Sequence, residues 1–201
     1  MPLYVILQAN HNRKSQGEIM VLKGSLQFQY GQDDCTFRTI HPEDVSQTYV
    51  DGLALENKYL SNIPTKLSIE TQQQYISQII TSPRDTICGL FLGKKLVGTA
   101  GIQNLSAGNY AAVGIFLFGT SLRGKGFGKV MVWAASQLAF SQIQLAGTMG
   151  GMKQDNIASL KSFLACGGVS SFDANRGIHQ VHISTTDFVT LPGLSEIQII
   201  Q

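Results

Sequence analysis

Three closely spaced glycines between an apolar segment and a helix-like segment constrain the fold more than any other part of the sequence. Gly124, Gly126 and Gly128 follow the apolar run 111–118 and precede the run 130–135. This order predicts a strand, a tight loop and a helix whose first N–H groups are exposed, which favours an anion. The loop also carries three basic residues: Arg123, Lys125 and Lys129. A plain strand-to-helix turn is the alternative, but such a turn needs one glycine rather than three.

Two phosphate-binding loops match this segment only in part. Residues 119–125 fit the first seven positions of a P-loop, but the eighth position must be Ser or Thr to hold magnesium, and here it is Gly126. The dinucleotide-binding pattern GxGxxG begins at Gly124, but its third glycine falls on Lys129. The sequence therefore disfavours a nucleoside triphosphatase and a Rossmann domain.

Size and composition limit the remaining classes. A chain of 201 residues suits one domain, or one domain with an appendage. A net charge of +2 with 14% charged residues gives no broad basic field, so we expect no nucleic-acid partner. The N-terminus lacks the pattern of a signal peptide, and no apolar stretch approaches the ~20 residues that cross a bilayer. We therefore expect a cytoplasmic protein without a membrane partner.

The cysteines agree with this compartment. Cys35, Cys88 and Cys166 are an odd number without CxxC spacing, so the sequence predicts neither a disulfide framework nor a zinc site. Three ordinary thiols of this kind are typical of a reducing cytosol.

The hydrophobic pattern predicts a mixed α/β domain with a short N-terminal extension. The extension, residues 1–33, is expected to form a small hairpin from the runs 18–23 and 26–30. A domain over 34–190 and a C-terminal tail over 191–201 follow. The expected strands are 35–40, 86–92, 96–103, 110–118, 144–152, 169–172 and 178–185. The expected helices are 42–55, 68–82, 125–140 and 155–166.

The glycine loop resembles the acyl-CoA-binding motif [QR]xxGx[GA] of the GCN5-related N-acetyltransferase (GNAT) superfamily, through Arg123, Gly126 and Gly128. A second block of that family, N-x-x-[AS]-x-x-x-[YF]-x-x-x-G, matches the residues Asn156, Ser159, Phe163 and Gly167. The spacing between the two blocks is also similar to that of the family.

The resemblance extends beyond the two blocks and covers about 35–187. The segment 37–44 resembles the family's opening strand and helix. The segments 58–60 (Lys-Tyr-Leu) and 74–76 (Gln-Tyr-Ile) resemble the branch that includes ribosomal-protein and amino-sugar-nucleotide acetyltransferases.

This resemblance implies a mostly antiparallel mixed sheet, flanked by helices, with two central strands splayed apart. Acetyl-CoA would be the co-substrate, with no metal. Its pantetheine arm would pair with backbone groups of Ile115, Phe116 and Leu117. Its pyrophosphate would bind the backbone N–H groups of Arg123, Gly124, Lys125, Gly126, Phe127, Gly128 and Lys129. Its chain would further contact Asn156, Ser159 and Phe163, although Asn156 also suits a helix N-cap and Phe163 suits a core.

The implied reaction is direct attack of a primary amine on the thioester in a ternary complex. The backbone N–H of Phe116 would stabilise the oxyanion. Glu56 is the first candidate for the general base, and the others are His41, Asp155, His179 and His182. Many family members have a tyrosine as general acid where this chain has Phe163. Either another hydroxyl serves (Ser159, Ser162 or Tyr110), or the thiolate leaves unaided.

The sequence leaves the acceptor open. An amino sugar, a metabolite, an antibiotic amine and a protein N-terminus all fit. The N-terminal extension would cover the acceptor cleft, form a homodimer contact, or do neither. Because the family tyrosine is missing, a non-catalytic acetyl-CoA-binding sensor or scaffold is the alternative function.

Overall fold

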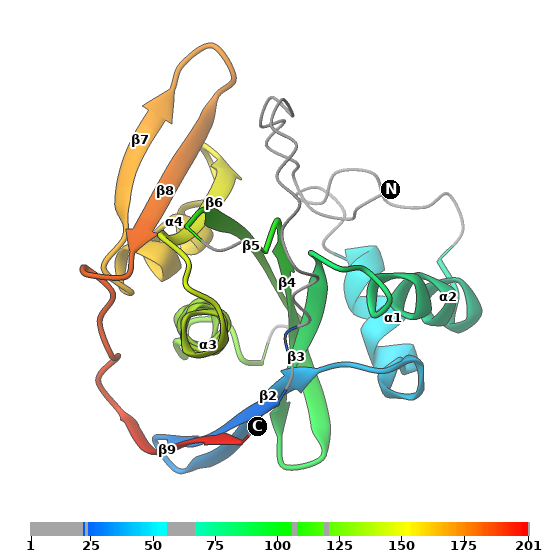
Figure 1. Ribbon diagram of the computed structural model, residues 1–201. Helices are drawn as coiled ribbons and strands as arrows, with labels where there is room; N and C mark the ends of the chain where they lie inside the picture. Colours follow the sequence, from blue (N-terminus) through cyan, green and yellow to red (C-terminus); the bar gives the residue numbers. More distant parts are fainter. Residues whose placement is uncertain (1–21, 23, 56–66, 106–107, 119–120, 201) are drawn as a thin grey trace.

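The computed structural model describes residues 22, 24–55, 67–105, 108–118 and 121–200. Within these ranges, one nine-stranded sheet runs through the molecule in the order β7-β8-β6-β5-β4-β3-β2-β1-β9 (Figure 1). Its strands are β1 (Ser25–Tyr30), β2 (Asp33–Thr39), β3 (Thr86–Leu92), β4 (Lys95–Gln103), β5 (Tyr110–Leu117), β6 (Gly147–Lys153), β7 (Val169–Asp173), β8 (Ile178–Ser184) and β9 (Leu194–Ile200). Its helices are η1 (Pro42–Asp44, a 3-10 turn), α1 (Gln47–Leu55), α2 (Ile69–Ile79), α3 (Phe127–Gln142) and α4 (Ile157–Leu164).

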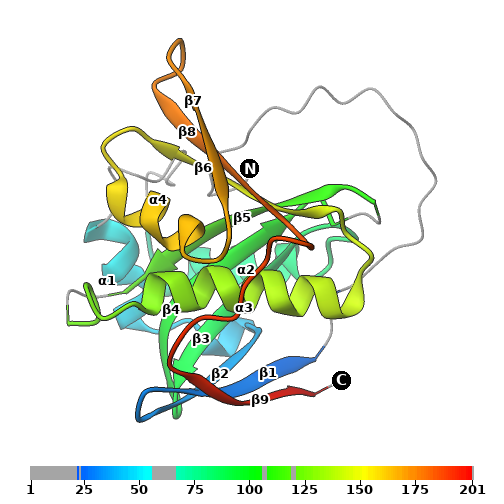
Figure 2. The ribbon, with the colours of Figure 1, turned by 90° about the vertical axis from the view of Figure 1, so that its left-hand side faces the viewer.

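The helices form two layers, one on each face of the sheet. Helices α3 and α4 cover one face, and α1 and α2 cover the other (Figures 1 and 2). The central strands β3 and β4 are buried on both faces, as their nearly continuous apolar sequences require. The core divides in the same way, with Trp133 of α3 buried in one cluster and Tyr49 of α1 buried in the other.

The sheet is antiparallel except at one junction. The described strand pairs run antiparallel, apart from β5 and β6, which run parallel. At this junction only three residue pairs connect the two strands, from Tyr110↔Gly147 to Ala112↔Met149. The mixed, mostly antiparallel sheet with splayed central strands is therefore confirmed.

The two ends of the described chain lie together at one edge of the sheet. β1 forms a hairpin with β2, in which Gly31 (φ +64°) supplies the turn, and β9 pairs with the other side of β1. Of the expected hairpin, the run 18–23 falls outside the described residues except Leu22. The segment 191–201, expected as a tail, contains β9. The domain boundaries themselves stay a prediction.

The helix expected over 42–55 is interrupted. Arg38 forms two hydrogen bonds of 2.8 Å with the Asp44 carboxylate, which also accepts from the backbone N–H of His41. These contacts close η1 as a separate turn, and Val45 then takes an extended conformation before α1 begins. Of the helices in the described ranges, none is long and apolar enough to cross a membrane.

Candidate functional site

The site lies where β5 and β6 separate. Beyond Ala112 and Met149 the two strands no longer pair, although β5 continues to Leu117 and β6 to Lys153. A pocket of about 740 Å³ opens in this gap. Its size falls within the range of about 300–1,000 Å³ that is usual for small-molecule sites.

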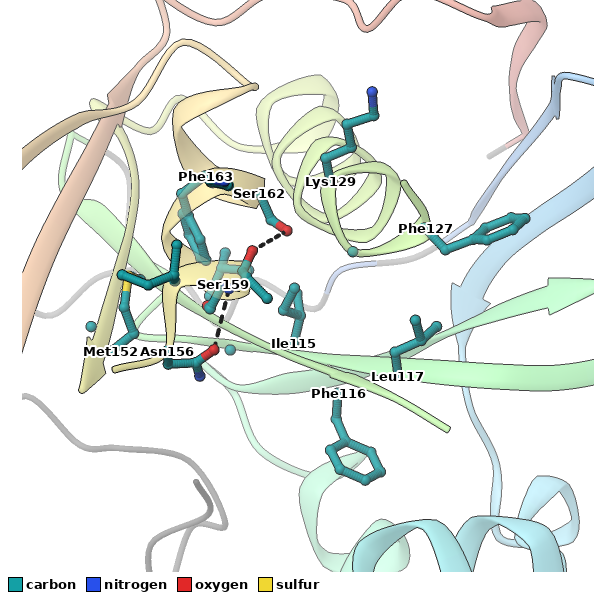
Figure 3. A pocket seen from close by; sticks show the side chains of 18 of the residues that line it. Ile115, Phe116, Leu117, Phe127, Lys129, Met152, Asn156, Ser159, Ser162 and Phe163 are labelled. Carbon is teal, nitrogen blue, oxygen red and sulfur yellow. Dashed lines mark hydrogen bonds between the residues drawn. The ribbon is translucent and has the colours of Figure 1, made fainter. Parts of the chain in front are cut away.

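The pocket brings most of the expected cofactor residues together (Figure 3). Its lining includes Ile115, Phe116, Leu117, Arg123, Gly124, Gly126, Phe127, Gly128, Lys129, Asn156, Ser159 and Phe163. Lys125 is the exception, because it does not line the pocket. Sequence reasoning named no residue of the facing wall, which consists of Met149, Gly150, Gly151, Met152 and Lys153. The signal was present in Gly150 and Gly151, since glycines inside a strand mark a close approach.

The glycine loop ends at an uncapped helix N-terminus. Gly126 is the N-cap of α3 with φ +88°, a left-handed conformation that favours glycine, and it has no side-chain cap. The N–H groups of Phe127, Gly128 and Lys129 come before the first turn is complete, so they have no acceptor within the helix. These groups and the positive end of the helix dipole lie beside the pocket, where they favour an anion.

The charged side chains around the pocket also favour an anion. Four cationic residues line it, namely Arg123, Lys129, Lys153 and Lys161. The carboxylate among its described lining residues is Asp155. The pocket is therefore a local positive region on a chain whose net charge is only +2.

The direction of the β5 backbone corrects one expectation. Phe118 N–H donates to Val97 at 2.8 Å, and residues 112–117 continue this register with β4. Because alternate residues of an antiparallel pair direct both backbone groups at the partner, Phe116 faces β4. The backbone groups of Val113, Ile115 and Leu117 face the gap instead.

A second hydrogen bond leads to the same assignment. The Ile40 N–H donates to the Ile87 carbonyl of β3 (3.1 Å), and when the alternation is followed from there across β3 and β4, Phe116 again faces β4. The N–H of Phe116, which was expected as the oxyanion donor, therefore points at β4, and the N–H groups of Ile115 and Leu117 point at the gap. The Phe116 side chain points to the face covered by α1 and packs near Phe118 (Figure 3).

Helix α4 forms the remaining wall, close against α3. Asn156 is its N-cap and accepts from the Ser159 N–H at 3.3 Å. The two helices approach closely at Gly128, where a Cβ would lie 2.9 Å from Ser162 Oγ and would force that hydroxyl to move. Ser162 Oγ donates to the carbonyl of Ala158 at 2.9 Å, one turn earlier in α4.

Phe163 stands where the resemblance implies a tyrosine in many family members, and its side chain has no proton to donate. It is 1% exposed, and its ring lies against Gly150, where a Cβ would be 2.6 Å from the ring carbon Cε1. The absence of a side chain at Gly150 therefore allows the ring to fill this part of the gap.

The four candidate bases in the described part of the chain are not brought together. Glu56 lies outside the described residues. Asp155 lines the pocket, but His41, His179 and His182 do not. His179 packs on Phe172 with ring centroids 4.9 Å apart, and His182 packs on Tyr110 at 5.3 Å. Both histidines therefore have aromatic partners outside the pocket lining.

Comparison with known proteins gives a family match. Residues 34–169 match the family model described as Acetyltransferase (GNAT) domain. No curated protein matches the sequence.

Solved structures share the fold at low sequence identity. RimJ from Mycobacterium smegmatis, in complex with CoA-disulfide, superposes with a TM-score of 0.70 at 13% identity over 88% of this chain and 93% of that chain. Ribosomal-protein-S5-alanine acetyltransferase from Vibrio fischeri gives 0.65 at 16% identity, over 78% and 96%. Spermidine N-acetyltransferase from Vibrio cholerae, in complex with CoA and spermine, gives 0.64 at 15% identity, over 78% and 98%. At these identities the likeness concerns the fold.

Proposed function

The chain belongs to the GNAT acetyltransferase family, and from this premise we propose that it transfers an acetyl group from acetyl-CoA to a primary amine. The observation that carries the proposal is the gap between β5 and β6, which ends at the uncapped N-terminus of α3. In acetyl-CoA an amide-bearing pantetheine arm is followed by a diphosphate. The arm matches the gap between the strands, and the diphosphate matches the helix N-terminus.

The residues present fit acetyl-CoA at each part of the pocket. Outward-facing backbone groups at Ile115 and Leu117 are free to pair with the amides of a pantetheine arm, because the pairing of β5 with β6 ends at Ala112 and Met149. The first N–H groups of α3, with Arg123 and Lys129 beside them, suit the diphosphate without a metal. In the described part of the chain, no cluster of His, Cys, Asp and Glu could hold a metal ion.

The chain's own groups divide the catalytic tasks. Acetyl-CoA supplies a reactive thioester. The N–H of Ile115 or Leu117 would stabilise the negative charge that develops on its carbonyl oxygen. Asp155, or Glu56 as first predicted, would take the proton of the incoming ammonium, directly or through water. Because Phe163 cannot protonate the leaving group, the thiolate, whose free pKa is near 8.5, would leave unaided.

The acceptor is proposed only as an amine. A small molecule (amino sugar, metabolite or antibiotic) and a protein N-terminus fit the chemistry equally well. The test is release of free CoA thiol from acetyl-CoA in the presence of a panel that contains each of these amines. Release that depends on one class supports the proposal and names the acceptor.

One observation supports a second candidate function. Phe163 is buried against Gly150, so the usual acid is missing and its place is filled. A sensor or scaffold that binds acetyl-CoA without turnover would need no acid. Tight binding of acetyl-CoA in calorimetry, combined with no thiol release for any amine class, would favour this candidate over the transferase.

A further inference from the structure

We propose that Tyr30 is a positioning residue that orients the cofactor loop from outside the pocket. Its hydroxyl donates a hydrogen bond to the Lys125 carbonyl at 3.3 Å, across 95 positions of sequence. Tyr30 ends β1, outside the residues matched by the family model, and it does not line the pocket. The inference rests on the proposed function, since it concerns the loop to which the diphosphate is assigned.

The hydrogen bond fixes one peptide plane of the loop. In a trans peptide the carbonyl oxygen and the next N–H point in opposite directions. With the Lys125 carbonyl turned toward Tyr30, the N–H of Gly126 turns away from Tyr30. Gly126 lines the pocket, whereas Lys125 does not. Tyr30 therefore presents the Gly126 N–H to the diphosphate.

The ring of Tyr30 is itself held in place. It packs edge-on against Phe127, the first residue of α3, with centroids 5.4 Å apart and an angle of 73°. Behind it lies Gly193, where a Cβ would be 3.5 Å from the ring. The N–H of Gly31 bonds to the Gly193 carbonyl at 3.0 Å, which joins the ends of β1 and β9. The edge of the sheet thus acts as a rigid support for the loop.

The same contact explains why residue 126 has no side chain. A Cβ at Gly126 would collide with the Tyr30 hydroxyl. Two separate features therefore favour glycine at this position: the left-handed backbone and the close approach of Tyr30.

The test compares Tyr30→Phe with Tyr75→Phe. Phenylalanine at 30 keeps the ring packing and removes only the hydroxyl, while Tyr75 is a half-buried tyrosine of α2 on the opposite face of the sheet. Calorimetry with CoA should show affinity weakened about three- to tenfold in Tyr30→Phe, as expected for one neutral hydrogen bond, and unchanged in Tyr75→Phe. In 15N–1H spectra, CoA should shift the Gly126 amide proton downfield in the unmodified protein and less in Tyr30→Phe.

The outcomes separate this inference from the function on which it rests. If the unmodified protein binds CoA and Tyr30→Phe binds it equally well with the same Gly126 shift, the positioning role is overturned and the proposed function stands. If the unmodified protein does not bind CoA, the proposed function is overturned and this inference with it. A loss of affinity with an unchanged Gly126 shift would also contradict the role, because the peptide plane would not be the cause.

Discussion

Gly124 and Gly126 share a left-handed backbone but differ in what surrounds them. Their φ angles are +75° and +88°. A Cβ at Gly126 would meet Tyr30 and also lie 2.9 Å from Lys129 Cε, whereas a Cβ at Gly124 has no neighbouring atom within 4 Å. A carboxylate at Gly126 would therefore test steric fit and charge together. At Gly124 a carboxylate meets no neighbouring atom, so the comparison with an uncharged side chain of the same size isolates the charge.

The first prediction compares Gly124→Asp with Gly124→Asn. Both residues tolerate the left-handed region better than other side chains do, and they have nearly the same size, so their backbone cost is similar. Only aspartate adds a negative charge at the proposed diphosphate site. We expect CoA to bind Gly124→Asp on the order of tenfold more weakly than Gly124→Asn at low salt, with a smaller difference at high salt. Equal affinities of the two variants would place the diphosphate elsewhere.

The second prediction concerns the three thiols, which are buried. Burial raises the pKa of Cys35, Cys88 and Cys166 to about 12 each, and for Cys166 the charge of Lys129 only partly opposes this. The thiolate is the reactive form, so native protein should react with a disulfide reagent at pH 8 at least about a hundredfold more slowly than unfolded protein. Unfolding should release all 3 thiols.

The expected low reactivity of the thiols also bears on the reaction. A transferase without a reactive cysteine has no thiol nucleophile to carry the acetyl group, which agrees with direct attack by the amine. One rapidly reacting thiol in CoA-free native protein would contradict the burial argument and reopen a covalent route.

At the scale of elements, the backbone of β5 serves both the sheet and the pocket, because alternate residues face β4 and the gap. Gly114 and Phe116 direct their N–H groups at β4, while Ile115 and Leu117 direct theirs at the gap. The hydrophobic pattern predicted the strand, and the family resemblance implied that its neighbour is splayed away. It could not predict which residues face the gap, because the choice depends on the register with β4, and one step of register exchanges the two sets.

The third prediction tests this alternation directly. Hydrogen exchange read residue by residue should show the amides of Gly114 and Phe116 protected in the free protein. The amides of Ile115 and Leu117 should exchange faster, and saturating CoA should slow them by tenfold or more, on the order of one added hydrogen bond. Protection of Ile115 and Leu117 that does not change with CoA would exclude the pairing role of β5.

Other elements show where sequence patterns succeed and fail. The start of α3 was predictable within two residues because glycines and an apolar run mark it locally. The break after η1 was not, since it depends on the pairing of Arg38 with Asp44 as well as on local propensity. β9 carries a strand-like sequence after Gly193, but its role comes from pairing with β1, which lies far away in sequence. Tyr30 gave no signal at all for the same reason.

At the scale of the whole molecule, the gap divides the sheet into two unequal parts. β5 leads one part through to β9, and β6, β8 and β7 form the other. Their strands pair directly through only three residue pairs between β5 and β6, and α3 packs across both parts, including a buried bond of 2.8 Å between Ser136 and Thr148 of β6. A ligand that spans the gap would therefore add contacts between β5 and β6 where the two strands do not pair.

The last prediction concerns how much a bound ligand stabilises the whole molecule. A ligand that binds only the folded state at a hundred times its dissociation constant adds about 2.7 kcal/mol to the free energy of unfolding. For a chain of this length that corresponds to a rise in Tm of roughly 5–10 °C. CoA should produce such a rise, whereas ATP with magnesium should not, because Gly126 stands where a P-loop needs Ser or Thr. A rise in Tm with ATP and magnesium but none with CoA would overturn the assignment of the glycine loop, since the loop would then bind a nucleoside triphosphate.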